Sequence, residues 1–312
     1  MSLIFMFPGQ SSIYPEMLER TLASWSWASA VVRYAEKVLD RDLLRHYRSE
    51  NPEIFKNNED VQIGCFLTSY LYLLALTRAG IETDTSLGLS LGEYNHLVHI
   101  GALSFEEALA LVAARGRAYD AGPQGKLASV FPIAVECLEA LLSEARSYGF
   151  VEIASYNSPR QHVIGGEAAA VDVVLKRIEE EIGLEPVVIE RRLPIHTSCF
   201  EPVARAFLPA LQCAAWKIPY RSYLPNVSAV EEKTPEPARF IELLASHVHR
   251  PVLWRKSIER LWEQQPESVF VEVGPRSVLF NLLSRSWIPC RRAKTDGSTN
   301  FDALVEQLAA RV

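Results

Sequence analysis

The clearest indication of the fold lies in residues Ser86-Leu87-Gly88-Leu89-Ser90-Leu91-Gly92-Glu93. This stretch places a G-x-S-x-G pattern between an apolar run at 86–89, which predicts a strand, and a helical pattern at 94–99. Small residues on both sides of a serine let a strand turn sharply into a helix, so that the hydroxyl projects at the helix N-terminus. In this setting the pattern predicts a nucleophilic Ser90, whereas G-x-S-x-G alone is equally typical of a Gly-flanked helix cap.

The chain before and after this turn alternates between strand and helix patterns. Residues 3–7 form an apolar run that Pro8-Gly9 stops, which predicts a buried strand ending in a sharp turn. Helical patterns follow at 25–39, 61–79 and 105–119. The N-terminal half therefore predicts an α/β domain with Ser90 at a strand end.

The segment 123–194 has a different pattern. Strand-like runs at 127–133, 151–156, 162–165 and 186–190 are interleaved with helical patterns at 134–148 and 167–182. The order βαββαβ is the ferredoxin-like arrangement. Strand-like runs then resume at 223–227 and 268–273, and residues 301–312 predict a closing amphipathic helix. We therefore expect a small subdomain inserted in the larger α/β domain.

The composition excludes several classes of protein. The chain has 312 residues, of which 48% are hydrophobic and 22% charged, so it is neither disordered nor a disulfide-stapled miniprotein. Its net charge of -6 argues against nucleic acid as the main partner. The five cysteines form no C-x-x-C pair and have no histidine at metal-ligand spacing, so we expect free thiols in a reducing compartment and no metal site.

The apolar segments do not predict a membrane protein. Residues 1–10 lack the basic start of a signal peptide. The longest apolar stretch, 65–76, is shorter than the roughly 20 residues that a membrane helix needs. We expect a soluble, cytoplasmic protein without a membrane partner.

A serine nucleophile needs a base, and the chain has seven histidines. Four lie in helix or strand patterns that favour a structural role: His46, His96, His99 and His162. His247 and His249 end a helical pattern, and His196 lies in a loop directly after the inserted segment. No Asp or Glu is placed to be a third member of a triad, so we expect a backbone carbonyl or amide to orient the base.

Seven motifs, in this order and spacing, resemble the malonyl-CoA:acyl carrier protein transacylases. They are Phe7-Pro8-Gly9-Gln10-Ser11-Ser12, 88–94, Arg115-Gly116-Arg117, Asn157-Ser158-Pro159-Arg160-Gln161, Pro194-Ile195-His196, Asn226-Val227-Ser228 and Val271-Glu272-Val273-Gly274-Pro275. Within that family the chain is most similar to the discrete acyltransferases that serve polyketide synthases in trans. The resemblance implies an α/β-hydrolase-like core, residues 1–122 and 195–312, with a ferredoxin-like subdomain at 123–194.

The resemblance also implies a role for individual residues. Ser90 would carry the acyl group, and His196 would be its general base. Gln10 and the backbone N–H of Leu91 would form the oxyanion hole. A guanidinium holds a carboxylate bidentately, and Arg115 matches the arginine that binds the free carboxylate of a malonyl group. The other expected substrate-binding residues are Leu89, Ile195, Asn157, Gln161 and His247.

The sequence departs from the family pattern at several of these positions. Leu89 stands where the family commonly has His, which makes the pocket more apolar, and His247 stands where it often has Gln. Ile195 occupies the position that separates substituted from unsubstituted malonyl groups, and its size favours malonyl. After Arg117 the chain reads Ala118-Tyr119-Asp120 in place of the usual Met-Gln.

The expected activity is transfer of a malonyl-type group from CoA to the phosphopantetheine thiol of an acyl carrier protein, in polyketide or fatty-acid biosynthesis. No bound cofactor is implied. The alternatives are an acyl-carrier-protein hydrolase of the same fold, an unrelated esterase and a catalytically silent carrier-binding module. Arg115 discriminates, because a hydrolase for uncharged acyl chains gains nothing from a buried guanidinium. An acidic carrier protein would dock on a basic rim formed by Arg191, Arg192, Arg250, Arg255, Lys256, Arg276, Arg291 and Arg292.

Overall fold

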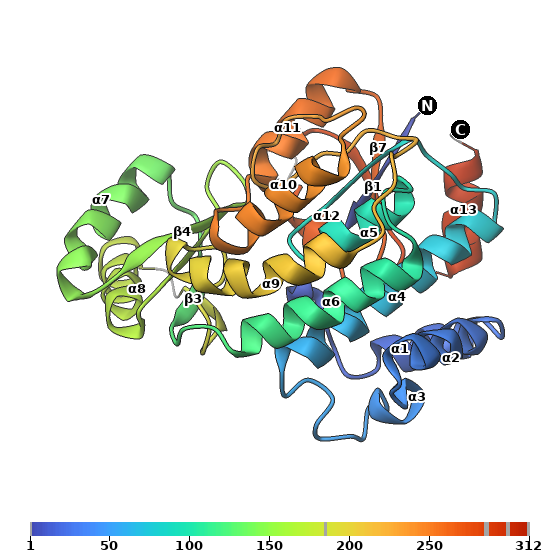
Figure 1. Cartoon of the computed structure of the whole chain (residues 1–312). Coiled ribbons are helices and arrows are strands. Elements are labelled where there is room, and N and C mark those ends of the chain that lie inside the picture. The colour runs from blue at the N-terminus through green and yellow to red at the C-terminus, as the bar shows by residue number, and fades with distance from the viewer. Residues whose placement is uncertain (1, 184–185, 284–286, 298–299, 311–312) are drawn as a thin grey trace.

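A parallel sheet of four strands forms the centre of the larger part of the molecule (Figure 1). The computed structural model describes residues 2–183, 186–283, 287–297 and 300–310. Every neighbouring pair in this sheet is parallel. The strands, in spatial order, are β2 (Thr85–Gly88), β1 (Leu3–Phe7), β7 (Val269–Glu272) and β8 (Arg291–Lys294).

Helices cover both faces of this sheet, which explains the continuous apolar sequence of β1. Phe5 and Phe7 belong to one apolar cluster with side chains of α4 (Asn58–Arg78) and α13 (Phe301–Ala309). Ile4 and Met6 point to the other face, in a cluster with α11 (Trp254–Gln264) and α12 (Val278–Leu282). All five residues of β1 are therefore buried.

The other helices of this larger part pack against α4, against α6 or against one another. They are α1 (Met17–Ser24), α2 (Ala28–Leu39), α3 (Leu43–His46), α5 (Gly92–His99), α6 (Phe105–Asp120), α9 (Glu201–Cys213) and α10 (Pro237–His249). By length and composition α4 could cross a membrane, but 78% of its most apolar window is buried inside the protein. It is therefore accounted for as a core helix, packed mainly against α6.

A smaller antiparallel sheet lies at the opposite end of the molecule from α13 (Figure 1). Its strands, in spatial order, are β4 (Val151–Tyr156), β5 (His162–Gly166), β3 (Lys126–Val130) and β6 (Val187–Glu190). Two helices, α7 (Val135–Ala145) and α8 (Ala168–Ile182), pack on one face. The chain order β3-α7-β4-β5-α8-β6 is the βαββαβ order expected from the sequence. The residue boundaries 1–122, 123–194 and 195–312 stay a prediction.

Several sequence predictions of local structure need correction. Residues 223–227 form no strand: Tyr223 makes one isolated bridge to Glu232, and a turn follows. The helix expected at 25–39 begins at Ala28, and the strand expected at 127–133 ends at Val130, just before the Phe131-Pro132 bond. The helix expected at 301–312 ends at Ala309, and its last two expected residues lie outside the described ones.

Candidate active site

Ser90 lies on a sharp turn between β2 and α5. Its φ of 51° is in the left-handed region, which a non-glycine residue rarely adopts and which is frequent at functional sites. A Cβ on Gly88 would lie 2.1 Å from the backbone of Gly92, and a Cβ on Gly92 would lie 2.1 Å from the carbonyl oxygen of Phe7. Both glycines are therefore required by close backbone approach, as the G-x-S-x-G pattern predicted.

Asn226 holds this turn from a distant part of the chain. Its Oδ1 accepts a hydrogen bond from the Ser90 backbone N–H at 2.8 Å, and its Nδ2 donates to the carbonyl of Gly88 at 2.7 Å. The side chain is buried. Asn226 belongs to the motif at 226–228, but the sequence alone does not indicate that its side chain holds this turn.

His196 is placed to take the proton of Ser90. The distance from Ser90 Oγ to His196 Nε2 is 2.7 Å, and His196 Nδ1 lies 2.7 Å from the backbone carbonyl of His247. A carbonyl only accepts, so Nδ1 carries the hydrogen and Nε2 is left to accept the hydroxyl proton. Burial, helped by His247 and Arg115, lowers the pKa of His196 well below its usual value. The imidazole is therefore neutral near pH 7, as a general base must be.

A buried histidine–carboxylate pair lies behind His196. The rings of His196 and His247 stack with centroids 4.7 Å apart, and His247 Nδ1 lies 2.8 Å from Glu93 Oε2. The other Glu93 oxygen accepts from Tyr223 Oη and from the Asn226 backbone N–H. His247 was predicted to bind substrate, but the structure places it behind His196 and not in the lining of the cavity described below.

Arg115 is a buried cation beside the nucleophile. Its side chain is 1% exposed, with Nη2 at 3.2 Å from Ser90 Oγ and Nη1 donating to Gln62 Oε1 at 2.8 Å. The guanidinium also lies over the ring of Tyr119, 4.3 Å from its centroid. Within the described residues no carboxylate forms an ion pair with Arg115. A buried charge without an opposite charge is costly, so the geometry favours an anionic group of the substrate as its partner.

Gln10 and Leu91 stand on either side of the turn. Gln10 begins the 3-10 helix η1 (Gln10–Ser12), which Pro8 and Gly9 separate from β1, and its Nε2 donates weakly to Asn58 Oδ1 at 3.4 Å. Leu91 is the N-cap residue of α5, and its side chain is fully buried in the core. The side chain of Gln10 and the backbone of Leu91 are the groups that the predicted oxyanion hole needs at these positions.

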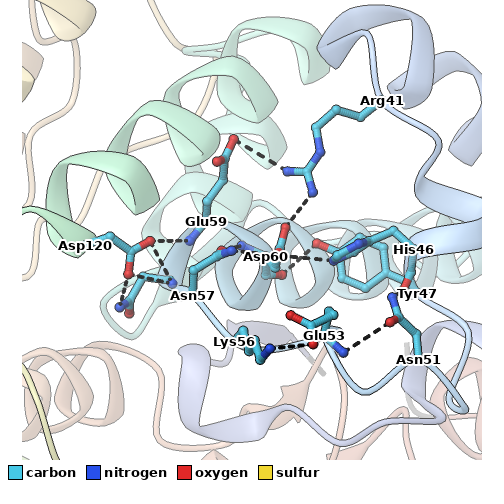
Figure 2. A network of polar contacts seen from close by, with 11 residues as sticks. Arg41, His46, Tyr47, Asn51, Glu53, Lys56, Asn57, Glu59, Asp60 and Asp120 are labelled. Atoms are coloured by element: carbon cyan, nitrogen blue, oxygen red, sulfur yellow. Dashed lines mark hydrogen bonds and ion pairs between the residues drawn. The ribbon is translucent and has the colours of Figure 1, made fainter.

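A polar network fixes the N-terminal end of α4 (Figure 2). The same helix carries Asn58, the partner of Gln10, and Gln62, the partner of Arg115. The Asp120 carboxylate accepts from the backbone N–H and the side-chain amide of Asn58, and Asp60 pairs with Arg41 at 2.6 Å. A carboxylate at a helix N-terminus is stabilised by the exposed N–H groups. Asp120, noted as a departure from the family pattern, thus anchors Asn58 beside Gln10.

A cavity of about 680 Å³ opens above Ser90 between the two sheets. Its lining includes four of the six predicted substrate-binding residues, namely Leu89, Ile195, Asn157 and Gln161, together with Gln10 and His196. Arg115 and His247 are not among the lining residues, and Arg115 reaches the site through its contact with Ser90 Oγ. The face of the smaller sheet that the helices leave uncovered forms one wall, with side chains from all four strands: Leu127, Ser129, Ala154, Ser155, Val163, Val187 and Ile189. Gln161 donates to Ser129 Oγ at 3.3 Å on this wall. The site is therefore shared by both sheets.

Comparison with known proteins identifies the family of this chain. A sequence model of the acyl transferase domain matches residues 4–297, so the chain belongs to that family. It is 28% identical over 288 residues to the malonyl CoA-acyl carrier protein transacylase of Bacillus subtilis strain 168, which covers 91% of this chain and 90% of that protein. These likenesses extend along nearly the whole chain and include both sheets.

Solved structures show the same architecture. The malonyl CoA-acyl carrier protein transacylase of Clostridium perfringens has a TM-score of 0.89 at 26% identity, covering 100% of this chain and 98% of that one. A type II polyketide synthase acyl-carrier protein in complex with its malonyl-transacylase gives a TM-score of 0.90 at 23% identity, covering 98% and 100%. At that identity the second likeness concerns the fold alone.

Proposed function

We propose that this acyltransferase moves a malonyl group from CoA to the phosphopantetheine thiol of an acyl carrier protein through an ester on Ser90. One observation carries the proposal: the Ser90 hydroxyl lies 2.7 Å from a neutral histidine nitrogen and 3.2 Å from a buried guanidinium without a carboxylate partner in the described chain. The first contact activates a nucleophile, and the second selects an acyl group with a free carboxylate. The names of the relatives support the same activity.

The proposed mechanism has two half-reactions. Ser90 Oγ attacks the thioester carbonyl while His196 Nε2 takes the hydroxyl proton, and the Gln10 side chain and the Leu91 N–H stabilise the oxyanion. The tetrahedral intermediate then expels the CoA thiolate, which receives the proton from His196. In the second half-reaction the phosphopantetheine thiol gives its proton to His196 and attacks the Ser90 ester. The serine leaves as an alkoxide, regains that proton, and the free enzyme is restored.

The substrate carboxylate is assigned to Arg115. In a malonyl group a single methylene separates the carboxylate from the reacting carbonyl, which suits a guanidinium within hydrogen-bond distance of Ser90 Oγ. The Leu89 and Ile195 side chains give this part of the cavity apolar walls. The hydrolase alternative is disfavoured, because an uncharged acyl chain would leave the buried Arg115 without an anionic partner.

The acceptor is proposed to be an acidic carrier protein that docks at the cavity entrance. Of the eight rim cations named from the sequence, Arg192 and Arg276 line the cavity. Arg255 pairs with Glu259 at 2.8 Å, and Arg292 donates to the backbone carbonyls of Phe280 and Leu283. Arg192, whose Nε lies 3.9 Å from Glu190 Oε1, and the exposed Arg250 are the two cations that we assign to docking. Charge reversal at both should weaken the salt dependence of transfer to the carrier, and an unchanged salt dependence would move docking elsewhere.

We also propose a setting for this activity. All five cysteines are free, which is typical of a reducing compartment and supports action in the cytoplasm. The substrate is a CoA thioester, and the proposed chemistry uses side chains of this chain without a bound cofactor. The carrier proteins that it serves would belong to fatty-acid or polyketide biosynthesis.

The test is a comparison of acyl donors with transfer and hydrolysis measured together. We expect kcat/KM for malonyl-CoA to exceed that for acetyl-CoA by roughly thirtyfold to thousandfold. This ratio corresponds to a free energy of about 2 to 4 kcal/mol for a sheltered carboxylate–guanidinium contact. Transfer to holo carrier protein should be faster than hydrolysis. A preference for uncharged acyl groups, or faster release to water than to the carrier, would establish the hydrolase instead.

A further inference from the structure

A second cavity, of about 570 Å³, adjoins the catalytic one. Arg276 and Val278 line both cavities, so the two spaces meet at these residues. Arg276 follows β7 and Lys294 ends β8, which places the second cavity at the carboxyl ends of the parallel strands. Ser90 lies at the same edge of the sheet, after β2. This edge is where open parallel sheets bind their ligands.

The second cavity carries an excess of positive charge. Arg20, Arg276 and Lys294 line it together with one carboxylate, Asp296. Asp296 is 5% exposed and fully engaged: Oδ2 accepts from Tyr14 Oη and from the Arg276 backbone N–H, both at 2.8 Å, and Oδ1 lies 3.6 Å from Arg20 Nη1. Arg20 therefore balances Asp296. Arg276 and Lys294 form no ion pair with a carboxylate of the described chain, so two positive charges are left for a ligand.

The backbone and neighbouring rings hold these two cations at the cavity. Arg276 has a φ of 62°, a left-handed conformation that the bond from its N–H to buried Asp296 maintains. Its guanidinium lies over the ring of Tyr14, 5.9 Å from the centroid, and Lys294 Nζ lies 5.5 Å from the centroid of Phe280. Cation–π contacts orient both groups without neutralising them.

We propose that this second cavity binds the phosphate groups of the nucleotide part of CoA. The inference rests on the proposed function, because it needs a CoA thioester in the catalytic cavity. The pantetheine arm would run from Ser90 past Arg276, and the phosphates would contact Arg276 and Lys294. A carrier protein presents the same arm without the nucleotide. The second cavity would therefore bind the CoA thioester in the first half-reaction and would not contact the carrier protein's phosphopantetheine arm in the second.

The experiment measures dissociation constants for CoA, dephospho-CoA and pantetheine by calorimetry, in wild type and in Arg276→Gly, Lys294→Met and the double variant. Glycine suits the φ of residue 276, so the first change removes the cation without strain. We expect each single change to weaken CoA binding roughly threefold and the pair roughly tenfold, since half-exposed ionic contacts are worth about 0.7 kcal/mol each. Pantetheine affinity should stay constant, and Arg276→Lys, which keeps the positive charge, should bind CoA more tightly than Arg276→Gly does.

Arg177→Gln is the matched control, because Arg177 is a partly exposed cation on α8 that lines neither cavity. Unchanged CoA affinity in the double variant, or an equal loss for pantetheine, would overturn the proposal. Slower transfer to holo carrier protein with CoA affinity unchanged would also overturn it and would assign the two cations to carrier docking. Failure of the proposed function is a separate result: wild type would bind CoA but take no malonyl group from malonyl-CoA.

Discussion

The two walls of the catalytic cavity are built differently. On the side of the parallel sheet, every residue of β1 and β7 is buried, and Ser90, His196 and Arg115 are each held by hydrogen bonds. On the side of the smaller sheet, the edge strand β6 exposes apolar side chains, with Val187 62% and Ile189 44% exposed. The wall on the side of the parallel sheet is therefore buried, and the wall at β6 is partly exposed to solvent.

The buried wall positions the reacting atoms, and the exposed wall leaves room for the substrate to enter. Atoms that exchange protons must be positioned within tenths of an ångström, and a buried, hydrogen-bonded wall provides that precision before substrate arrives. A long acyl-thioester arm must also enter and leave, which requires an open side. The apolar side chains of β6 give that arm a surface to cover, and exposed apolar patches of this kind mark binding sites. Changes on the first wall should therefore affect the rate far more than changes on the second.

The largest effect is expected for His196→Ala. Loss of the general base should reduce the rate of Ser90 acylation roughly a hundredfold to ten-thousandfold. Single-turnover kinetics with malonyl-CoA measure this rate directly. His249→Ala is the matched control. His249 is the last residue of α10, two positions after His247, and it does not line the catalytic cavity. A near-normal rate for His196→Ala would assign the base to another histidine.

Arg115→Ala should reorder the acyl donors. Removing the guanidinium should lower kcat/KM for malonyl-CoA by roughly thirtyfold to thousandfold and leave that for acetyl-CoA equal or higher. Arg117→Ala is the control. Arg117 lies two residues after Arg115 on α6 and is an exposed cation paired with Glu59 of α4, so its removal should preserve the preference for malonyl-CoA over acetyl-CoA. If Arg115→Ala lowers both activities equally, Arg115 supports the fold and does not select the substrate.

His247→Gln should act on the pH dependence. The backbone carbonyl at 247 still orients His196, so acylation at pH 8 should change little. His247 helps to lower the pKa of His196, so its removal raises that pKa and protonates the base at a higher pH. The acid limb of the pH–rate profile should therefore shift to higher pH relative to wild type. A pH profile that keeps its acid limb in place would show that His247 exerts no electrostatic effect on His196.

The smallest effect is expected on the open wall. Val187→Ser and Ile189→Ser replace exposed side chains and should change the free energy of unfolding by less than about 0.5 kcal/mol. Phe5→Ala in β1 removes a fully buried ring and should cost about 3 to 5 kcal/mol. Urea denaturation compares all three variants. A large loss for the β6 variants would mean that this wall is a packed part of the core.

Local patterns predicted the reacting turn well. The G-x-S-x-G turn depends on eight consecutive residues, and its strand and helix are visible in the same stretch. The sequence also predicted a backbone carbonyl or amide as the group that orients the base, and the structure has the carbonyl of His247 in contact with His196 Nδ1. The turn needed short-range information alone, whereas the residue that supplies this carbonyl lies 51 positions away.

Long-range partners could not be predicted in the same way. Asn226 contacts the turn at Ser90 from 136 positions away in the sequence. The apolar residues near Asn226 predicted a strand that the structure does not have, because burial beneath this turn gives the same apolar pattern as a buried strand. The Glu93–His247 pair depends on how α5 and α10 pack, which no periodicity encodes. Strand β8 was missed because its sequence, Arg291–Lys294, is polar for a strand at the edge of the parallel sheet.

The most direct test of the account is the intact mass of the protein after brief incubation with malonyl-CoA. Wild type should gain the mass of one malonyl group, held as an ester, and should lose it when holo acyl carrier protein is added. Ser90→Ala should gain nothing, because the structure places no other described hydroxyl beside His196 Nε2. A malonyl adduct of the same stoichiometry on Ser90→Ala would contradict the assignment of Ser90 as the nucleophile.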